Sequence, residues 1–211
     1  MPRTSVRLAP NSAKFLKMIV YQGFENIDKL ENPVVAIGSF DGVHLGHRCI
    51  LRYLCETAKQ CGGQSVVVTF DPHPQMLVNP DSDFFTINPL DKNLSLIAEQ
   101  GVDVAVVVPF THSFSKLSYT EFIENHIIGN LHAKTLVMGP NHALGHNREG
   151  DRSKIEALCQ QHQVSVVDIP EFLMNNAKVH SSTIRKLIEK KEFNKVDELL
   201  GYHYESLEIR D

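Results

Sequence analysis

PVVAIGSFDGVHLGHRCILRYLCETAKQC, residues 33–61, joins a valine-rich run to a segment of helical spacing through a turn that contains three glycines. The apolar run 33–40 is typical of a strand buried on both faces of a sheet. Apolar residues recur in 45–61 at the spacing of an amphipathic helix. The residues of its predicted buried face are Ile50, Leu54, Ala58 and Cys61. A strand that leads through a tight turn into a helix indicates an α/β fold.

The same alternation continues along the chain. Further apolar, β-branched runs predict strands at 64–70, 102–110, 133–139 and 163–169. Helical spacing is found at 89–101, 118–129 and 181–201, and the first two segments end at Gly101 and Gly129, which suit a helix C-terminus. Alternating strands and helices form parallel pairs through right-handed crossovers. We therefore predict an α/β domain with a Rossmann-like doubly wound parallel sheet over residues 18–211. Residues 1–17 are expected to be a loose extension, with Met18 as an alternative start.

Composition and charge limit the possible partners. The chain has 211 residues and a formal net charge of −4, whereas broad nucleic-acid binding needs a basic face, so we expect no nucleic-acid partner. No apolar run reaches the length of a membrane span, and the N-terminus lacks the apolar core of a signal peptide, so we expect no membrane association. The four cysteines form no C-x-x-C pair. We expect them to be buried or half-buried thiols of a cytoplasmic protein.

The turn GSFDGVHLGH, residues 38–47, lies where such a sheet binds ligands. Open α/β sheets bind ligands beyond the carboxyl ends of their strands. The N-terminus of the following helix offers unpaired N–H groups and a partial positive charge, which suit a phosphate. Glycines allow a close approach of the backbone, and His44 and His47 can donate hydrogen bonds beside the anion. The spacing matches neither the dinucleotide fingerprint nor a Walker A loop. We therefore predict a phosphate site of another kind.

Four motifs of the chain together resemble one family. They are GSFDGVHLGH (38–47), VVVTFDPHP (66–74), LVMGPNHALGHNREGD (136–151) and VHSSTIRKLI…LLGYHY (179–204). Their order and spacing resemble the FMN adenylyltransferase module of bacterial bifunctional riboflavin kinase/FAD synthetases, within the HxGH nucleotidyltransferase superfamily. The resemblance implies transfer of AMP from ATP to FMN, giving FAD and pyrophosphate, by in-line attack of the FMN phosphate on the ATP α-phosphate. It also implies Mg²⁺ as cofactor.

The resemblance assigns roles to particular residues. His44 and His47 would bind the α-phosphate and the leaving phosphates, and Arg185 would hold the β- and γ-phosphates. The implied ATP-binding residues are Gly38, Ser39, Phe40, Asp41, Gly46, Ser181 and Ser182. The implied FMN-binding residues are Pro72, His73 and Asn141, and Asn141 is also the implied magnesium ligand.

The chain departs from the family pattern in three respects. Ser39 stands where asparagine is common, and His180 replaces the first serine of the second signature. The LLG-x-x-Y motif leads into a riboflavin kinase domain in the bifunctional family, and nothing in this sequence resembles that domain. Either the chain is a stand-alone adenylyltransferase or the sequence is incomplete. In the first case we expect it not to phosphorylate riboflavin, and a separate riboflavin kinase to supply its FMN.

Other interpretations of the same residues stay open. The two histidines could be a metal pair, although no cysteine or carboxylate completes a ligand set at a recognisable spacing. Asp41 could bond its own backbone and cap the turn. Phe84 and Phe85 could form a lid over the flavin or belong to the core. For function, the alternatives are another HxGH enzyme, of the cytidylyltransferase or pantetheine-phosphate adenylyltransferase type, and a degenerate flavin- or nucleotide-binding protein.

Overall fold

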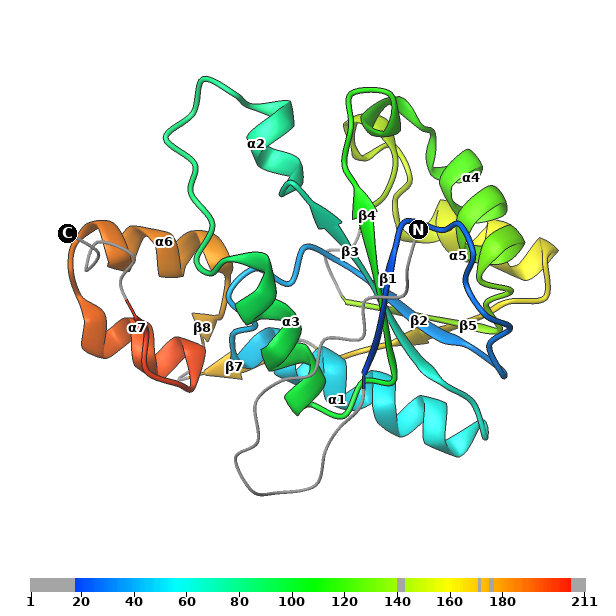
Figure 1. The fold of residues 1–211 in the computed structure, drawn as a ribbon, viewed down its shortest axis with the longest axis horizontal. Helices are drawn as coiled ribbons and strands as arrows, with labels where there is room; N and C mark the ends of the chain where they lie inside the picture. Colours follow the sequence, from blue (N-terminus) through cyan, green and yellow to red (C-terminus); the bar gives the residue numbers. More distant parts are fainter. Residues whose placement is uncertain (1–17, 140–142, 171, 175–176, 206–211) are drawn as a thin grey trace.

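A six-stranded sheet, parallel at every pairing, forms the centre of the computed structural model (Figure 1). The structure describes residues 18–139, 143–170, 172–174 and 177–205. The strands are β1 (Ile19–Gln22), β2 (Val34–Ile37), β3 (Ser65–Asp71), β4 (Val104–Pro109), β5 (Thr135–Met138) and β6 (Ser165–Asp168). Their order across the sheet is β1-β4-β3-β2-β5-β6.

This strand order reverses direction beside β2. The chain runs outward from β2 through β3 to β4, and then returns to place β5 and β6 on the other side. Val34 of β2 is accordingly in register with Ser65 of β3 and with Thr135 of β5. The crevice between the carboxyl ends of β2 and β5 is the switch point at which such sheets bind ligands. The predicted doubly wound parallel sheet is confirmed.

Helices cover both faces of the sheet. They are α1 (Leu45–Gln60), α2 (Pro74–Val78), α3 (Leu90–Glu99), η1 (Phe114–Lys116), α4 (Tyr119–Glu121), η2 (Phe122–Asn130), η3 (His146–Arg148), α5 (Arg152–Gln161), α6 (Ser181–Glu189) and α7 (Phe193–Leu200). In Figure 1, α1 and α3 lie on one side of the sheet, and α4 and α5 lie on the other. Alternate residues of β2 point to opposite faces. Val34 and Ala36 therefore pack in one hydrophobic cluster with α1 and α3, whereas Val35 and Ile37 pack in another with η2 and α5.

The last described segments, up to residue 205, form a smaller unit beside the sheet. The short hairpin of β7 (Leu173–Met174) and β8 (Ala177–Lys178) leads into α6, and α7 follows at the left end of Figure 1. Ile184, Val196 and Leu200 are buried in a third cluster, together with Ile87 from the segment before α3. This cluster fixes α6 next to the loops at the carboxyl ends of the strands.

All five predicted strands and the helices between them are confirmed, and the segment 181–201 forms two helices. The helices α2 and α5 and the short helices η1 and η3 were not predicted from the sequence. Two strand elements were also missed. The first is β1, a four-residue edge strand with mixed exposure that lacks the valine-rich pattern of the central strands. The second is the β7–β8 hairpin, in which each strand has two residues. The predicted extension at 1–17 lies outside the described residues.

The predicted inward face of α1 is wrong at one end. Leu51, Leu54 and Ala58 are buried, whereas Ile50 is half-buried and Cys61 is exposed. The reason is that α1 ends at Gln60, so that Cys61 is the C-cap residue and no longer follows the helical period. The expectation of buried or half-buried thiols therefore fails at Cys61 and holds at the other three free cysteines, Cys49, Cys55 and Cys159.

Gly129 does not end its helix, contrary to the prediction. It lies inside η2, a π-helix that continues to Asn130, and the left-handed residue that follows is His132, with φ 54°. A π-helix brings carbonyls five residues back into hydrogen-bonding range. A Cβ at Gly129 would lie 3.0 Å from the carbonyl oxygen of Glu124. The glycine therefore makes room for that carbonyl instead of ending the helix.

Within the described part of the chain, no helix is both long and apolar enough to cross a membrane.

Candidate active site

The β2–α1 loop, residues 38–44, leaves the carboxyl end of β2 and turns tightly into α1. Gly42 has φ +79°, and a Cβ there would lie 3.0 Å from the side chain of Ile87. Gly46, on α1, has ordinary helical φ, but a Cβ there would lie 3.1 Å from the ring of His44. Conformational freedom is thus needed at Gly42 and space at Gly46, so the predicted glycine cluster serves two different purposes.

His44 and His47 form a stacked pair at the start of α1. Their ring centroids are 3.7 Å apart, with planes inclined by 17°. His44 is the N-cap residue of the helix, and its Nδ1 accepts a hydrogen bond from the backbone N–H of His47 at 3.3 Å. A ring nitrogen that accepts carries no proton, so neutral His44 holds its proton on Nε2. Among the described residues, the buried Nδ1 of His47 has no hydrogen-bond partner.

Both imidazoles are neutral at physiological pH. Burial lowers the pKa of His44 to about 3, and the charges of His180 and Arg185 act in the same direction. Burial lowers the pKa of His47 well below its usual range, and His44 adds to this effect. Each ring can therefore donate one hydrogen bond to an anion without carrying a full positive charge of its own.

The N-terminus of α6 lies beside this pair. A Cβ at Gly46 would be 3.4 Å from the carbonyl oxygen of Val179, two residues before α6 begins. His180 is the N-cap residue of α6, but its side chain makes no capping hydrogen bond. Ser182 is exposed in the first turn. Two helix N-termini, those of α1 and α6, therefore meet at the same edge of the sheet, and each contributes a partial positive charge.

Asp41 and Arg185 form a buried ion pair at this junction. Arg185 Nη1 donates to Asp41 Oδ2 at 2.7 Å, and the two side chains are 13% and 2% exposed. The carboxylate also accepts hydrogen bonds from the backbone N–H groups of Ile87 and Asn88. Burial raises the pKa of Asp41, and the Ile87 N–H and the Arg185 charge oppose that rise. The hydrogen bonds recorded for the carboxylate therefore go to distant segments, not to its own turn as one interpretation of the sequence expected.

A hydrogen-bonded ring surrounds Gly42, and the sequence analysis missed it. The N–H of Gly42 donates to Asn93 Oδ1 at 3.0 Å, and the carbonyl oxygen of Gly42 accepts from the Tyr202 hydroxyl at 2.7 Å. Asn88 Nδ2 closes the ring by donating to Asn93 Oδ1 and to the Tyr202 oxygen. Tyr202 lies in the LLGYHY motif, which was singled out only for its position in the family pattern. Loop geometry at Gly42 therefore depends on the segment that follows α7.

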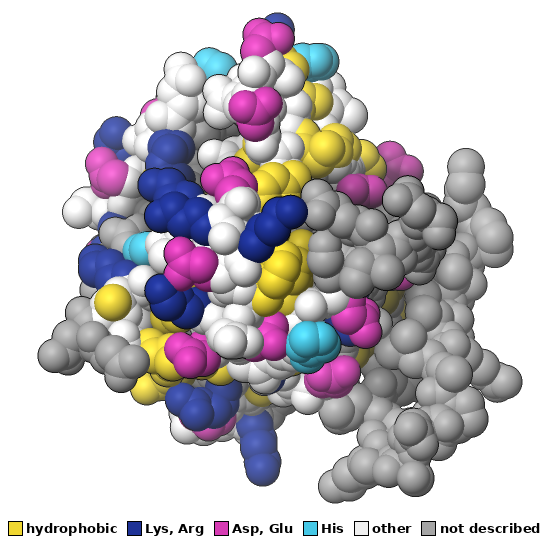
Figure 2. All heavy atoms as spheres, turned by 90° about the vertical axis from the view of Figure 1, so that its left-hand side faces the viewer, with side chains coloured by type: hydrophobic (Ala, Val, Ile, Leu, Met, Phe, Trp, Pro, Cys, Tyr) yellow, Lys and Arg dark blue, Asp and Glu magenta, His cyan; other side chains and the backbone are white. Residues whose placement is uncertain are grey.

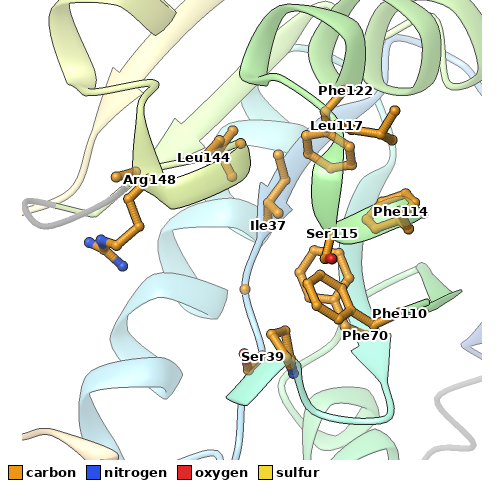
Figure 3. A pocket seen from close by; sticks show the side chains of 14 residues that line it. Ile37, Ser39, Phe70, Phe110, Phe114, Ser115, Leu117, Phe122, Leu144 and Arg148 are labelled. Carbon is orange, nitrogen blue, oxygen red and sulfur yellow. The ribbon is translucent and has the colours of Figure 1, made fainter. Parts of the chain in front are cut away.

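A cavity of about 330 Å³ opens next to the β2–α1 loop (Figure 3). Four phenylalanines line one side: Phe70, Phe110, Phe114 and Phe122. Neighbouring rings among them are in edge-to-face or tilted contact, with centroids 5.5–6.1 Å apart. Gly38 and Ser39 of the loop line the cavity, and Leu144 and Arg148 lie across from the phenylalanines in Figure 3. The sequence signal that could have found these rings is that Phe70 is the next-to-last residue of β3 and Phe110 directly follows β4.

Two of the three FMN-binding candidates, Pro72 and His73, lie outside the lining of this cavity. The cavity lining includes Pro74, but Pro72 and His73 are not part of it. His73 instead packs against Phe84, with ring centroids 4.6 Å apart, and Phe84 lies 4.4 Å from the guanidinium carbon of Arg185. Phe84 and Phe85 are half-buried, and Phe84 contacts site candidates. Asn141, the remaining FMN-binding and magnesium candidate, lies outside the described residues.

Metal ligands are sparse at this site. The part of the chain that the structure describes contains no group of three histidine, cysteine, aspartate or glutamate side chains suited to a metal ion. The carboxylate of Asp41 is already engaged by Arg185 and backbone donors. These observations do not support the alternative in which His44 and His47 serve as a metal pair.

The face formed around α6 and α7 carries charges of both signs. In Figure 2, lysine and arginine side chains are interspersed with aspartate and glutamate side chains on this face. A surface that binds nucleic acid without regard to sequence needs a continuous basic stripe. This face is mixed in charge, and the expectation of no nucleic-acid partner stays a prediction.

Comparison with known proteins identifies a family to which this chain is similar. Residues 26–183 match the family model of FAD synthetase. A Listeria monocytogenes protein named bifunctional riboflavin kinase/FMN adenylyltransferase is 35% identical over 175 residues, which are 82% of this chain and 55% of the relative. An Escherichia coli protein of the same name is 28% identical over 189 residues, 89% of this chain and 60% of the relative. The chain thus spans 55–60% of the length of these relatives.

A solved structure supports the fold. The crystal structure of a Streptococcus pneumoniae protein named as a macrolide-efflux protein superposes with a TM-score of 0.77 and 24% identity, covering 88% of this chain and 60% of the other. At this identity the likeness concerns the fold alone. The family match extends over more than half of the chain and includes the β2–α1 loop, all four phenylalanines of the cavity and the first turn of α6. The chain belongs to the FAD synthetase family.

Proposed function

We propose that this chain transfers AMP from ATP to FMN, giving FAD and pyrophosphate, within the nucleotidyltransferase-like domain predicted over residues 18–211. The FMN phosphate attacks the α-phosphorus of ATP, a new P–O bond forms, and the bond to the β-phosphate oxygen breaks. The observation that carries the proposal is that one loop contributes to two sites. Gly38 and Ser39 line an aromatic cavity, and His44 of the same loop begins the helix that carries His47.

The triphosphate of ATP would lie between the N-termini of α1 and α6. Neutral His44 would donate a hydrogen bond from its Nε2–H to the α-phosphate, because its Nδ1 already accepts the capping hydrogen bond of α1. His47 would donate beside it, and Arg185 and Ser182 would contact the β- and γ-phosphates. The hydroxyl of Ser181 already donates to the backbone oxygen of Asp41 at 3.1 Å, which leaves its backbone N–H as its contribution.

The flavin ring of FMN would lie in the phenylalanine-lined cavity. Its volume of about 330 Å³ is within the range of pockets that hold small molecules, which are mostly apolar with a few polar groups. Flat aromatic ligands are well matched by rings in edge-to-face and offset contact. Pro72, His73 and Asn141 remain proposed neighbours of the flavin or its phosphate. The same cavity argues against the cytidylyltransferase and pantetheine-phosphate alternatives, because neither acceptor presents a large flat ring.

Magnesium would enter with ATP. Because Mg²⁺ commonly binds through substrate phosphates and one or two protein oxygens, the site does not need a dedicated group of carboxylates. Bound magnesium neutralises charge on the phosphates. We further propose that a riboflavin kinase, the activity named with FMN adenylyltransferase in the relatives, supplies the FMN, and that the protein acts in the cytoplasm, where thiols such as its four free cysteines stay reduced.

Chromatographic detection of FAD tests the proposal. The purified chain is incubated with FMN, Mg²⁺ and ATP, and we expect FAD and pyrophosphate in equal amounts. His47→Ala removes a phosphate donor and should lower the rate by about 10²–10³-fold. His203→Ala is the matched control. His203 is an exposed histidine that follows α7 and pairs with Asp197 of that helix. Replacing ATP with CTP, or FMN with riboflavin, should give no dinucleotide. Nucleotide binding without any FAD would refute the proposal and favour the degenerate-binding alternative.

A further inference from the structure

Asp41 contacts the first turns of α6 at two points. Its backbone oxygen accepts from Ser181 Oγ at 3.1 Å, and its carboxylate accepts from Arg185 Nη1 at 2.7 Å. Ser181 and Arg185 are four residues apart, so they lie on the same face of the helix. One residue of the β2–α1 loop therefore fastens a helix that begins 140 residues later in the chain.

The Asp41 carboxylate is held from several sides. Both of its oxygens accept from the backbone N–H of Ile87, at 2.9 and 3.0 Å, and Oδ1 also accepts from Asn88 N–H at 3.4 Å. The residue is 2% exposed. A carboxylate fixed by this many donors cannot turn toward a ligand in solvent without breaking them, and leaving such donors unpaired is costly. Its position suits a support for another side chain better than a contact to substrate.

Arg185 is held between this carboxylate and an aromatic ring. The guanidinium carbon lies 4.4 Å from the centroid of the Phe84 ring. A guanidinium is planar and carries five N–H donors, so fixing one nitrogen and one face also fixes the direction of the remaining donors. Arg185 remains 13% exposed, and those donors are suited to a forked contact with phosphate.

We propose that Asp41 is a positioning residue that orients the Arg185 guanidinium toward the triphosphate and does not itself bind ATP. This inference rests on the proposed function, in which Arg185 contacts the β- and γ-phosphates. The negative charge of the Asp41 carboxylate lowers the net positive charge near ATP and so does not itself favour ATP binding. Its contribution to catalysis is therefore to fix the direction of the Arg185 donors. Loss of Asp41 should therefore lower the rate at which pyrophosphate leaves more than it weakens binding of ATP.

A double-mutant cycle tests this coupling. The four proteins are the wild type, Asp41→Asn, Arg185→Met and the double variant, each assayed for FAD formation per folded molecule. We expect Asp41→Asn to lower kcat at least tenfold, with the KM for ATP within threefold of the wild type. In the Arg185→Met background the same change should alter kcat less than threefold, because residues that act through one another are not additive. Equal losses in both backgrounds would overturn the proposal, as would a raised KM for ATP with kcat unchanged.

Asp103→Asn is the matched control. Its carboxylate accepts from the Ser65 N–H and hydroxyl at 2.8 and 2.7 Å, at the start of β3, the opposite edge of the sheet from the site. This variant should lose stability while the folded fraction keeps its kcat. Should Asp41→Asn fail to fold, Arg185→Lys is the second variant, because it keeps the positive charge and removes the forked guanidinium donors. A fall in kcat with unchanged KM for ATP supports the proposal. A rise in the KM for ATP alone overturns it. If the wild type makes no FAD, both the proposed function and this inference fail.

Discussion

The ring of His44 lies 3.7 Å from the ring of His47, centroid to centroid, while its Nδ1 accepts the backbone N–H of His47. One side chain therefore performs two tasks. It caps α1 with one nitrogen, and in the proposed function the N–H of its other nitrogen contacts the ATP phosphate. The two tasks can be separated by substitution.

His44→Asn and His44→Ala should differ in stability and agree in activity. Asparagine is a favourable N-cap residue and alanine is not, so only the alanine variant should lose about 1 kcal/mol of helix-capping stability. Neither variant keeps the Nε2 donor, and both should lower the rate of FAD formation by about 10²–10³-fold. Thermal unfolding and single-turnover assays measure the two effects. Near-normal activity in His44→Asn would show that the histidine serves as a cap only.

Stability should fall as the pH is lowered from 7 to 5. The folded-state pKa of His44 is about 3, below the usual histidine value of 6.5, so between these values the unfolded chain binds a proton that the folded chain does not. The unfolded state is therefore favoured as pH falls through 6.5, and the free energy of unfolding should decrease by about 2 kcal/mol between pH 7 and 5 from this residue. Urea unfolding at the two pH values measures the change.

His44→Asn provides the comparison for this pH effect. The decrease should be smaller in the variant but still present, because the pKa of His73 is also lowered by burial, to about 4. An identical decrease in both proteins would mean that His44 is protonated to the same extent in the folded and unfolded chains.

Phe110→Ala should raise the KM for FMN about tenfold or more, because a lost aromatic wall costs roughly 1.5–3 kcal/mol of apolar burial. The ring lines the cavity and contacts both Phe70 and Phe114. The KM for ATP should stay within twofold of the wild-type value. Phe193→Ala is the control, since this ring packs on Tyr204 at the surface of α7. Steady-state kinetics with each substrate varied in turn measure the two KM values. Parallel increases in both would contradict the proposal that the flavin ring lies in this cavity.

Gly42→Ala should be more destabilising than Gly62→Ala. Both glycines have positive φ, +79° and +61°, where a Cβ costs about 1–2 kcal/mol. Only at Gly42 would the added carbon also meet a side chain, that of Ile87 at 3.0 Å, whereas nothing lies within 4 Å of a Cβ at Gly62. Thermal unfolding of the two variants isolates the effect of that contact. Equal melting temperatures would show that the loop shifts freely around Gly42.

Local patterns in the sequence determined most of the fold. Continuous valine-rich strands buried on both faces, separated by amphipathic helices, allow few arrangements other than a parallel sheet with helices on both sides. The stretch 33–61 was sufficient to predict a ligand site at the end of β2, because the carboxyl edge of such a sheet is where ligands bind. Edge strand β1 escaped notice because a short, half-exposed strand has no strong periodicity.

Only the tertiary structure decided how distant segments meet at that edge. Asp41 and Arg185 are 144 residues apart, and Gly42 and Tyr202 are 160 apart. No local spacing predicts such pairs, because they form only when α6 and the segment after α7 dock against the β2–α1 loop. The four phenylalanines of the cavity likewise come from separate elements. Sequence periodicity reports which face of an element is buried, whereas the partner across a contact is set by packing, and it is packing that turns the histidine motif into a site with defined neighbours.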